Sequence, residues 1–122
     1  MRFRLILLLV LISGGFFGCA HQHQFHGFYS LTEKELSDAR KAALEAAASP
    51  EAWQRVRGKR LTQEPLKLDE TKITYNFDCD HNDRIEVTIP SGGTFGWHAC
   101  YVQVTVNRTT QQVLAMYEGY WP

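Results

Sequence analysis

The chain has 122 residues, of which 44% are hydrophobic and 21% are charged, and its basic and acidic side chains are equal in number. This length suits one domain. The composition is that of a globular protein, so disordered and collagen-like classes are excluded. Because there is no basic surplus to attract a phosphate backbone, no nucleic acid is expected among the partners.

Residues 1–18 have the pattern of a secretory signal peptide. Arg2 and Arg4 precede an apolar run over residues 5–12, and small residues follow it. The run is too short for a bilayer, which needs about 20 apolar residues. A basic start, a short apolar run and a small-residue exit are typical of a signal peptide. A buried helix or a membrane anchor is the alternative interpretation.

Phe16-Phe17-Gly18-Cys19 resembles the lipobox of bacterial lipoproteins, in which a small residue precedes a cysteine. The resemblance implies that Cys19 becomes the first mature residue and carries acyl chains such as palmitate, which would attach the protein stably to a membrane. Ala20 in the next position implies the outer membrane, with the protein facing the periplasm. Ordinary cleavage after Ala20 is the alternative.

The mature chain would keep 104 residues. Since Arg2 and Arg4 leave with the signal peptide, eleven basic residues would face thirteen acidic ones, a net charge of −2. Residues 19–30 lack apolar periodicity, which predicts a lipid-anchored flexible tether. Residues 31–122 are then a single folded domain.

A capping box predicts a helix over residues 33–48. Thr32 is its N-cap and Glu35 completes the T-x-x-E pattern. Apolar side chains then recur at helical spacing, at Leu36, Ala39, Ala43, Leu44 and Ala47. Ser49 and Pro50 end this helix and start a shorter one over residues 50–57.

Strict alternation predicts four strands in the remainder of the chain. Residues 72–79 and 84–90 form a first hairpin, in which Phe77 lies opposite Ile85. Residues 91–96 are the next connection, and residues 97–122 contain two longer strands with a polar turn between them. The predicted fold class is α+β, with a helix and a short second helix packed on a four-stranded antiparallel meander.

Cys79 and Cys100 are the expected disulfide partners, because an exported protein folds in an oxidising compartment. The meander argues against the bond. It places Cys100 level with Val87, two strands or about 9.5 Å from the first strand, whereas a disulfide needs Cα atoms within about 7 Å. The bond therefore requires residues 78–83 to fold back over the sheet, and both outcomes stay open.

The sequence offers no enzyme motif. The patterns of serine hydrolases, zinc proteases and P-loop enzymes are missing, and Cys100 and His98 are expected on opposite faces of their strand. We therefore predict no catalytic residue, no metal site and no cofactor.

The stretch SGGTFGW is the most suggestive surface. Gly92 and Gly93 allow unusual backbone angles, while Phe95 and Trp97 offer the large apolar area found at interface hot spots. Tyr120 and Trp121 would extend the patch from the last strand. These six residues are the candidates for binding a partner. The alternative is a hairpin whose aromatic side chains pack back onto the sheet.

The sequence therefore predicts a non-enzymatic, periplasm-facing lipoprotein that binds a protein partner as an accessory of an envelope complex. An inhibitor or immunity protein against an exported enzyme or toxin is the alternative. A carrier of small ligands would need an apolar pocket between helix and sheet, and the small alanines of the helix predict close packing instead.

The order of a helix and four antiparallel strands resembles the cystatin-like and PepSY-like group of small folds. The segment VTVNRTTQQVLAMYEGYW is similar to the closing hairpin of PepSY-type modules. This resemblance implies an architecture and carries no functional residue, because fold alone does not give function.

Overall fold

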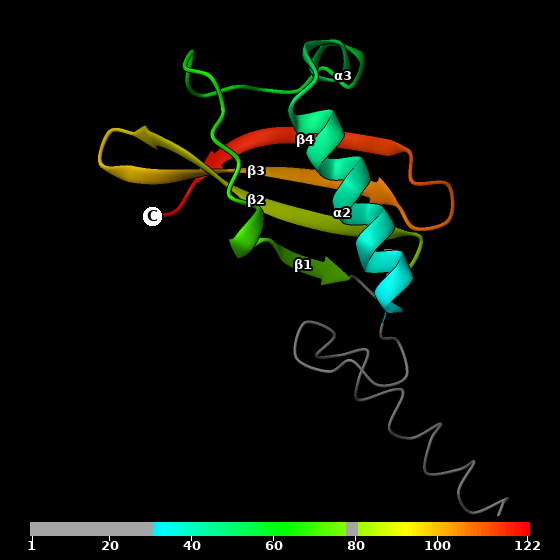
Figure 1. Cartoon of the computed structure of the whole chain (residues 1–122). Helices are drawn as coiled ribbons and strands as arrows, with labels where there is room; N and C mark the ends of the chain where they lie inside the picture. Colours follow the sequence, from blue (N-terminus) through cyan, green and yellow to red (C-terminus); the bar gives the residue numbers. More distant parts are fainter. Residues whose placement is uncertain (1–30, 78–80) are drawn as a thin grey trace, which may run out of the picture.

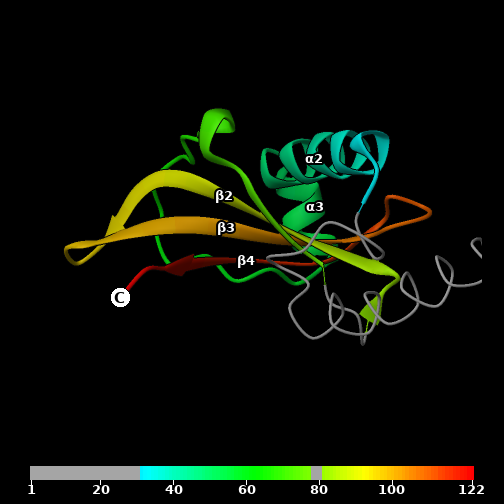
Figure 2. The same cartoon turned by 90° about the horizontal axis from the view of Figure 1, so that it is seen from below.

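The computed structural model describes residues 31–77 and 81–122, and in them one helical layer covers one face of a four-stranded sheet (Figures 1 and 2). The expectations for the signal peptide, for Cys19 and for the tether lie outside the described residues. The elements are α2 (Glu33–Ala47), α3 (Pro50–Arg55), a 3-10 turn η1 (Glu70–Lys72), β1 (Thr74–Phe77), β2 (Arg84–Phe95), β3 (His98–Asn107) and β4 (Val113–Tyr120). The predicted α+β class is confirmed.

Neither of the two described helices has the length and apolarity to span a membrane.

Helix α2 begins as its sequence predicts. The Thr32 hydroxyl accepts a hydrogen bond from the Glu35 backbone N–H at 3.1 Å, and the Glu35 carboxylate accepts one from the Thr32 backbone N–H at 3.2 Å. This reciprocal pair satisfies donors that the first turn leaves without a partner. The buried face of the helix consists of alanines only, Ala39, Ala43, Ala46 and Ala47. Such short side chains let the helix axis lie close to the sheet.

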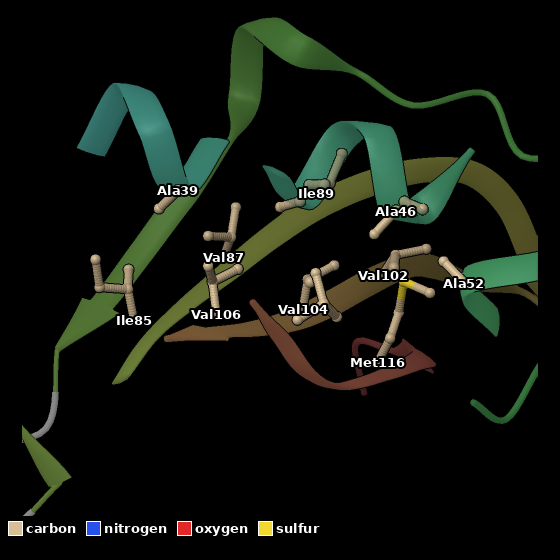
Figure 3. Close-up of a cluster of buried hydrophobic side chains, with 13 residues drawn as sticks. Ala39, Ala46, Ala52, Ile85, Val87, Ile89, Val102, Val104, Val106 and Met116 are labelled. Carbon is tan, nitrogen blue, oxygen red and sulfur yellow. The ribbon is translucent and has the colours of Figure 1, made fainter. Parts of the chain in front are cut away.

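The sheet is an antiparallel meander in the order β1-β2-β3-β4. Its inner face meets the alanines of α2 through branched side chains (Figure 3). Fully buried members of this core are Ile85, Val87, Ile89, Val102, Val104 and Val106. β-branched residues pack well on a pleated surface, and the short alanine side chains of α2 complement them. The core is therefore an alanine layer on a valine–isoleucine layer.

The first hairpin has the predicted register, because Phe77 lies opposite Ile85. The second does not. Val87 pairs with Val104 and not with Cys100, because residues 91–95, which the sequence suggested as a connection, continue strand β2. The chain then reverses in two residues, Gly96 and Trp97. Gly96 has φ +64°, the sign that a type II′ hairpin needs in its first turn position.

Cys100 carries a free, buried thiol. Its expected partner, Cys79, lies outside the described residues, so the Cys79–Cys100 bond stays a prediction.

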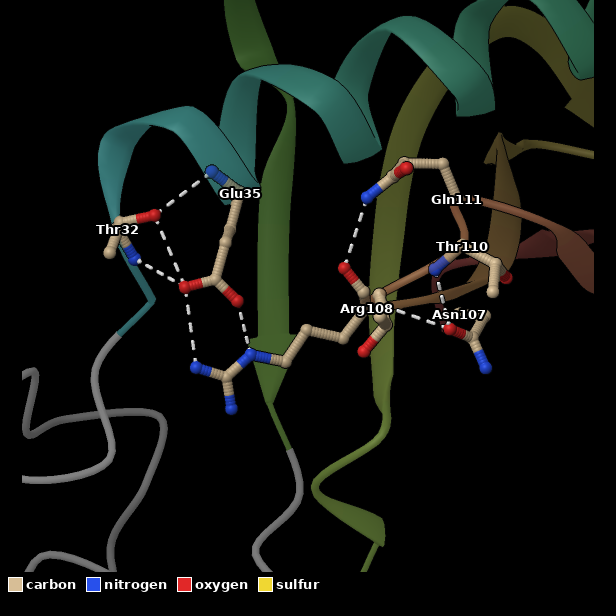
Figure 4. A network of polar contacts seen from close by, with 7 residues as sticks. Thr32, Glu35, Asn107, Arg108, Thr110 and Gln111 are labelled. Atoms are coloured by element: carbon tan, nitrogen blue, oxygen red, sulfur yellow. Dashed lines mark hydrogen bonds and ion pairs between the residues drawn. The ribbon is translucent and has the colours of Figure 1, made fainter.

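An ion pair ties the start of α2 to the turn between β3 and β4 (Figure 4). Arg108 donates hydrogen bonds from Nε and from Nη2 to the Glu35 carboxylate, and the bond from Nη2 to Oε1 is 3.2 Å long. Its guanidinium lies 5.1 Å from the centre of the Phe77 ring. The hydrogen bonds from Arg108 lower the pKa of Glu35 to about 2. The helix N-terminus is therefore fixed to the sheet by charge as well as by packing.

This pair makes part of the stability depend on pH. The folded pKa of Glu35 is depressed, so its contribution is present above about pH 4.5 and is lost as the pH falls toward 2. We expect Glu35→Gln to lower the free energy of unfolding by about 1–2 kcal/mol at pH 7. Urea unfolding of both proteins at pH 7 and pH 2.5 measures the effect. If the two proteins differ in free energy of unfolding by the same amount at pH 2.5 as at pH 7, the ionised Glu35 carboxylate is not the source of the difference.

Candidate functional site

The hairpin of β2 and β3 extends past the end of α2 as an arm, which we define as residues 91–99 (Figures 1 and 2). The register between the two strands shifts between Pro90 and Thr94, as in a β-bulge, which bends a strand. Gly92 lies at this irregularity with φ +70°, and a Cβ there would stand 2.9 Å from Lys67 Cβ. A glycine is thus needed for the backbone angle and for the close approach of the neighbouring chain.

Aromatic side chains of the arm and of the end of β4 form one continuous group, the arm cluster of Phe95, Trp97, His98 and Tyr120. The Phe95 and Tyr120 rings stack with their centres 5.0 Å apart. Trp97 stacks on His98 at 4.0 Å, and His98 lies 5.2 Å from Tyr120. By register this cluster lies on the sheet face that α2 covers further along.

A second group, the open-face cluster of Tyr101, Tyr117 and Trp121, lies on the opposite face of the sheet. Tyr101 is its centre, 4.6 Å from the Trp121 ring and 6.3 Å from the Tyr117 ring. Gly119 makes room for it, since a Cβ there would come within 2.6 Å of the Tyr101 ring. Burial raises the pKa of Tyr117, whose hydroxyl donates to Gln103 Oε1 at 2.9 Å.

The structure therefore brings five of the six candidate residues into one region, and Gly93 beside it. Trp97 at the tip is 85% exposed, and Phe95, Tyr120 and Trp121 are 41–44% exposed. Each of these rings gives part of its surface to a neighbouring ring and part to solvent. Gly93 is different, because it faces Thr62 and Glu118 at ordinary contact distances. These aromatic side chains combine a large apolar area with polar ring edges.

Sequence reasoning missed the buried carboxylate of Glu118, whose side chain is fully inaccessible. Its Oε1 accepts hydrogen bonds from Arg60 Nε at 3.0 Å, from the Leu61 N–H at 2.8 Å and from the Thr62 N–H at 2.9 Å. Its Oε2 accepts one from the Thr62 hydroxyl at 2.8 Å. Residues 59–69, which we call the strap, are thereby held against the sheet at the base of the arm.

Burial raises the pKa of Glu118, but the hydrogen bonds from Thr62, Arg60 and Leu61 outweigh it, and the net direction is downward. The carboxylate is therefore ionised and committed to the strap. A signal was present in the sequence, because Glu118 follows Met116 on the inward side of β4. A charged residue in that position requires a partner, but the partner is 58 residues away in the chain.

Cys100 and His98 lie on the same face of β3, two residues apart, so the expectation that they point to opposite faces is wrong. They still form no reactive pair. Cys100 is 1% exposed, and burial, helped by the nearby Glu118 charge, raises the pKa of its thiol. A thiol of this kind stays protonated and inert.

Among residues 31–77 and 81–122, no group of three or more His, Cys, Asp or Glu side chains is arranged to hold a metal ion. The site is thus an aromatic surface on the arm, positioned by a bulge, a two-residue turn and the strap. Comparison of the chain with protein-family models, with curated proteins and with solved structures finds no match.

Proposed function

We propose that the chain is a non-enzymatic bacterial lipoprotein that binds a protein partner through the arm and open-face clusters. Acylated Cys19 would hold it in the outer membrane facing the periplasm. The observation that supports binding is the arm itself, which carries Phe95 and Trp97 beyond the helical layer, beside Tyr120 of β4, with large apolar areas open to solvent. Aromatic residues are enriched at protein interfaces and dominate their energetics.

The leading form of this proposal is an accessory subunit of an envelope complex. Its interface would extend over both aromatic clusters. They lie on opposite faces of the same end of the sheet and so suit a partner that contacts the arm on both faces. Energy spread in this way makes each single contact modest. Crosslinked pull-down from the cell envelope should then recover membrane complexes.

A second form is an inhibitor or immunity protein, and the exposure of Trp97 favours it. This side chain is 85% exposed at the tip of a two-residue turn, which is a suitable shape for entering a concave site on an exported enzyme or toxin. A soluble hydrolase should then be recovered, bound tightly and in one-to-one ratio.

Substitution of Trp97 by alanine separates the two forms. If Trp97 fills a pocket, its loss should weaken binding by at least about 2 kcal/mol, or roughly 30-fold in Kd. If the interface is spread over both clusters, the loss should stay below about 1 kcal/mol. Titration calorimetry with the recovered partner measures the difference.

The control is Leu114→Ala, which removes an apolar side chain of β4 that lies outside both clusters and is 40% exposed, close to the values for Phe95 and Tyr120. It should leave recovery unchanged. The triple variant Phe95→Ala, Trp97→Ala, Tyr120→Ala should abolish recovery in either form. If this variant folds and still retrieves the same proteins as the wild type, the arm is not the binding surface.

A further inference from the structure

An apolar pocket of about 510 Å³ lies between the end of α2, the start of α3 and the strap. Its walls include Ala48, Pro50, Trp53, Leu66 and Leu68, with Arg60 among the lining residues. This volume falls within the range of sites for small molecules, which are mostly apolar with a few placed polar groups. The close packing expected between helix and sheet is present along α2, and the pocket opens where α2 ends.

The walls of the pocket are held in place without a ligand. The Trp53 indole donates from Nε1 to the Ala47 carbonyl at 2.9 Å, and Arg60 lies over its ring at 5.4 Å. The strap side is fixed by the bonds of Arg60 and Thr62 to Glu118. A preformed cavity binds a ligand at a low ordering cost.

Arg60 gives the pocket its polar end. Its Nε bonds Glu118, and its Nη2 donates to the Glu64 carbonyl at 2.6 Å, while Nη1 has no hydrogen-bond partner among the described residues. Glu118 receives three further hydrogen bonds from Leu61 and Thr62, so its charge does not rely on Arg60 alone. The guanidinium therefore retains a donor group for an anion.

Ser91, which is bonded to the strap, carries a second polar group without a partner. The hydroxyl of Ser91 is buried and makes no hydrogen bond among the described residues. The backbone carbonyl of Ser91 accepts a bond at 2.9 Å from the N–H of Lys67, the residue between the pocket-lining Leu66 and Leu68. A buried polar atom without a partner is rare in native proteins and calls for an explanation.

We propose that this pocket binds a small amphipathic carboxylate, such as a medium-chain fatty acid. The apolar chain would lie against Trp53, Leu66 and Leu68, and the carboxylate would accept hydrogen bonds from Arg60 Nη1. A guanidinium is the preferred protein partner of a carboxylate. This inference is independent of the proposed partner binding, because the pocket and the arm are separate surfaces.

Tryptophan fluorescence tests the proposal directly. The chain has three tryptophans, so the full-length variant Trp97→Phe, Trp121→Phe leaves Trp53 in the pocket wall as the only reporter. Decanoate, titrated below its micellar concentration, should produce a saturable change in Trp53 emission. Decanol should bind at least about fivefold more weakly, because it lacks the charge that a guanidinium favours.

A pocket-filling variant keeps the test specific. Ala48 is exposed and lines the pocket, so Ala48→Phe in the same background should weaken decanoate binding at least about tenfold. Ala115→Phe, at an exposed alanine of β4 outside the pocket, is the matched control and should bind as before. A non-saturable response, equal affinity for decanol, or unchanged binding in Ala48→Phe would each overturn the proposal.

Discussion

Replacing Glu118 with alanine is expected to lower the free energy of unfolding by about 3–5 kcal/mol, because the donors that this buried carboxylate satisfies are left without an acceptor. The substitution removes four hydrogen bonds at once. Arg60 would keep its charge beside an apolar wall, and the N–H groups of Leu61 and Thr62 would lose their acceptor. The strap should therefore detach from the sheet.

Urea unfolding monitored by circular dichroism measures this loss. Glu118→Gln keeps the shape and one acceptor oxygen, so it should fall between the wild type and alanine. Glu45→Ala, at an exposed position of α2, should change stability by no more than about 0.5 kcal/mol. If Glu118→Ala lowers the free energy of unfolding by less than about 1 kcal/mol, the strap does not depend on this carboxylate.

Gly58→Ala is expected to destabilise the protein by about 2–3 kcal/mol, although it adds a single methyl group. A Cβ at this position would stand 2.4 Å from Trp53 Cε3 and 2.9 Å from the Met116 carbonyl oxygen. The ring is itself fixed by the bond to Ala47, and the carbonyl belongs to strand β4. Neither neighbour can move without disturbing the helix or the sheet.

Gly93→Ala is the matched control for Gly58→Ala. The nearest atoms to a Cβ on Gly93 are 3.8 Å away, which is ordinary contact, and its φ lies outside the positive region. Its unfolding free energy should stay near that of the wild type, or rise slightly because the unfolded chain loses freedom. Equal destabilisation of both variants would show that the contacts around Gly58 are not the cause.

Much of the fold follows from signals that are local in the sequence. The capping box of Thr32 and Glu35 gave the start of α2, and alternation gave the pairing of Phe77 with Ile85. The second register was missed because glycines usually indicate a loop, whereas here Gly92 and Gly93 lie within a bulged strand. Alternation alone cannot distinguish these two outcomes, because the bulge lies against Lys67, which is distant in the sequence.

The candidate surface was predictable in part, because it too follows from the local signals that set strand pairing. Strand pairing alone brings Trp97 near Tyr120, because both lie toward the same end of the sheet. The strap and the pocket were not predictable, because Arg60 and Glu118 meet across 58 residues of chain. No local pattern in the sequence encodes such a contact, which forms only when α3 and β4 come together.

The way the strap crosses β4 also bears on how the molecule avoids self-association. β4 is an edge strand, and exposed edges are templates for aggregation. The Lys59 carbonyl accepts a hydrogen bond from the Glu118 N–H at 2.8 Å. Lys59 also forms an isolated parallel bridge with Tyr117 of β4. One hydrogen-bonding group of that edge, the Glu118 N–H, is thus already used. The strap therefore covers part of the edge on which a neighbouring chain could extend the sheet.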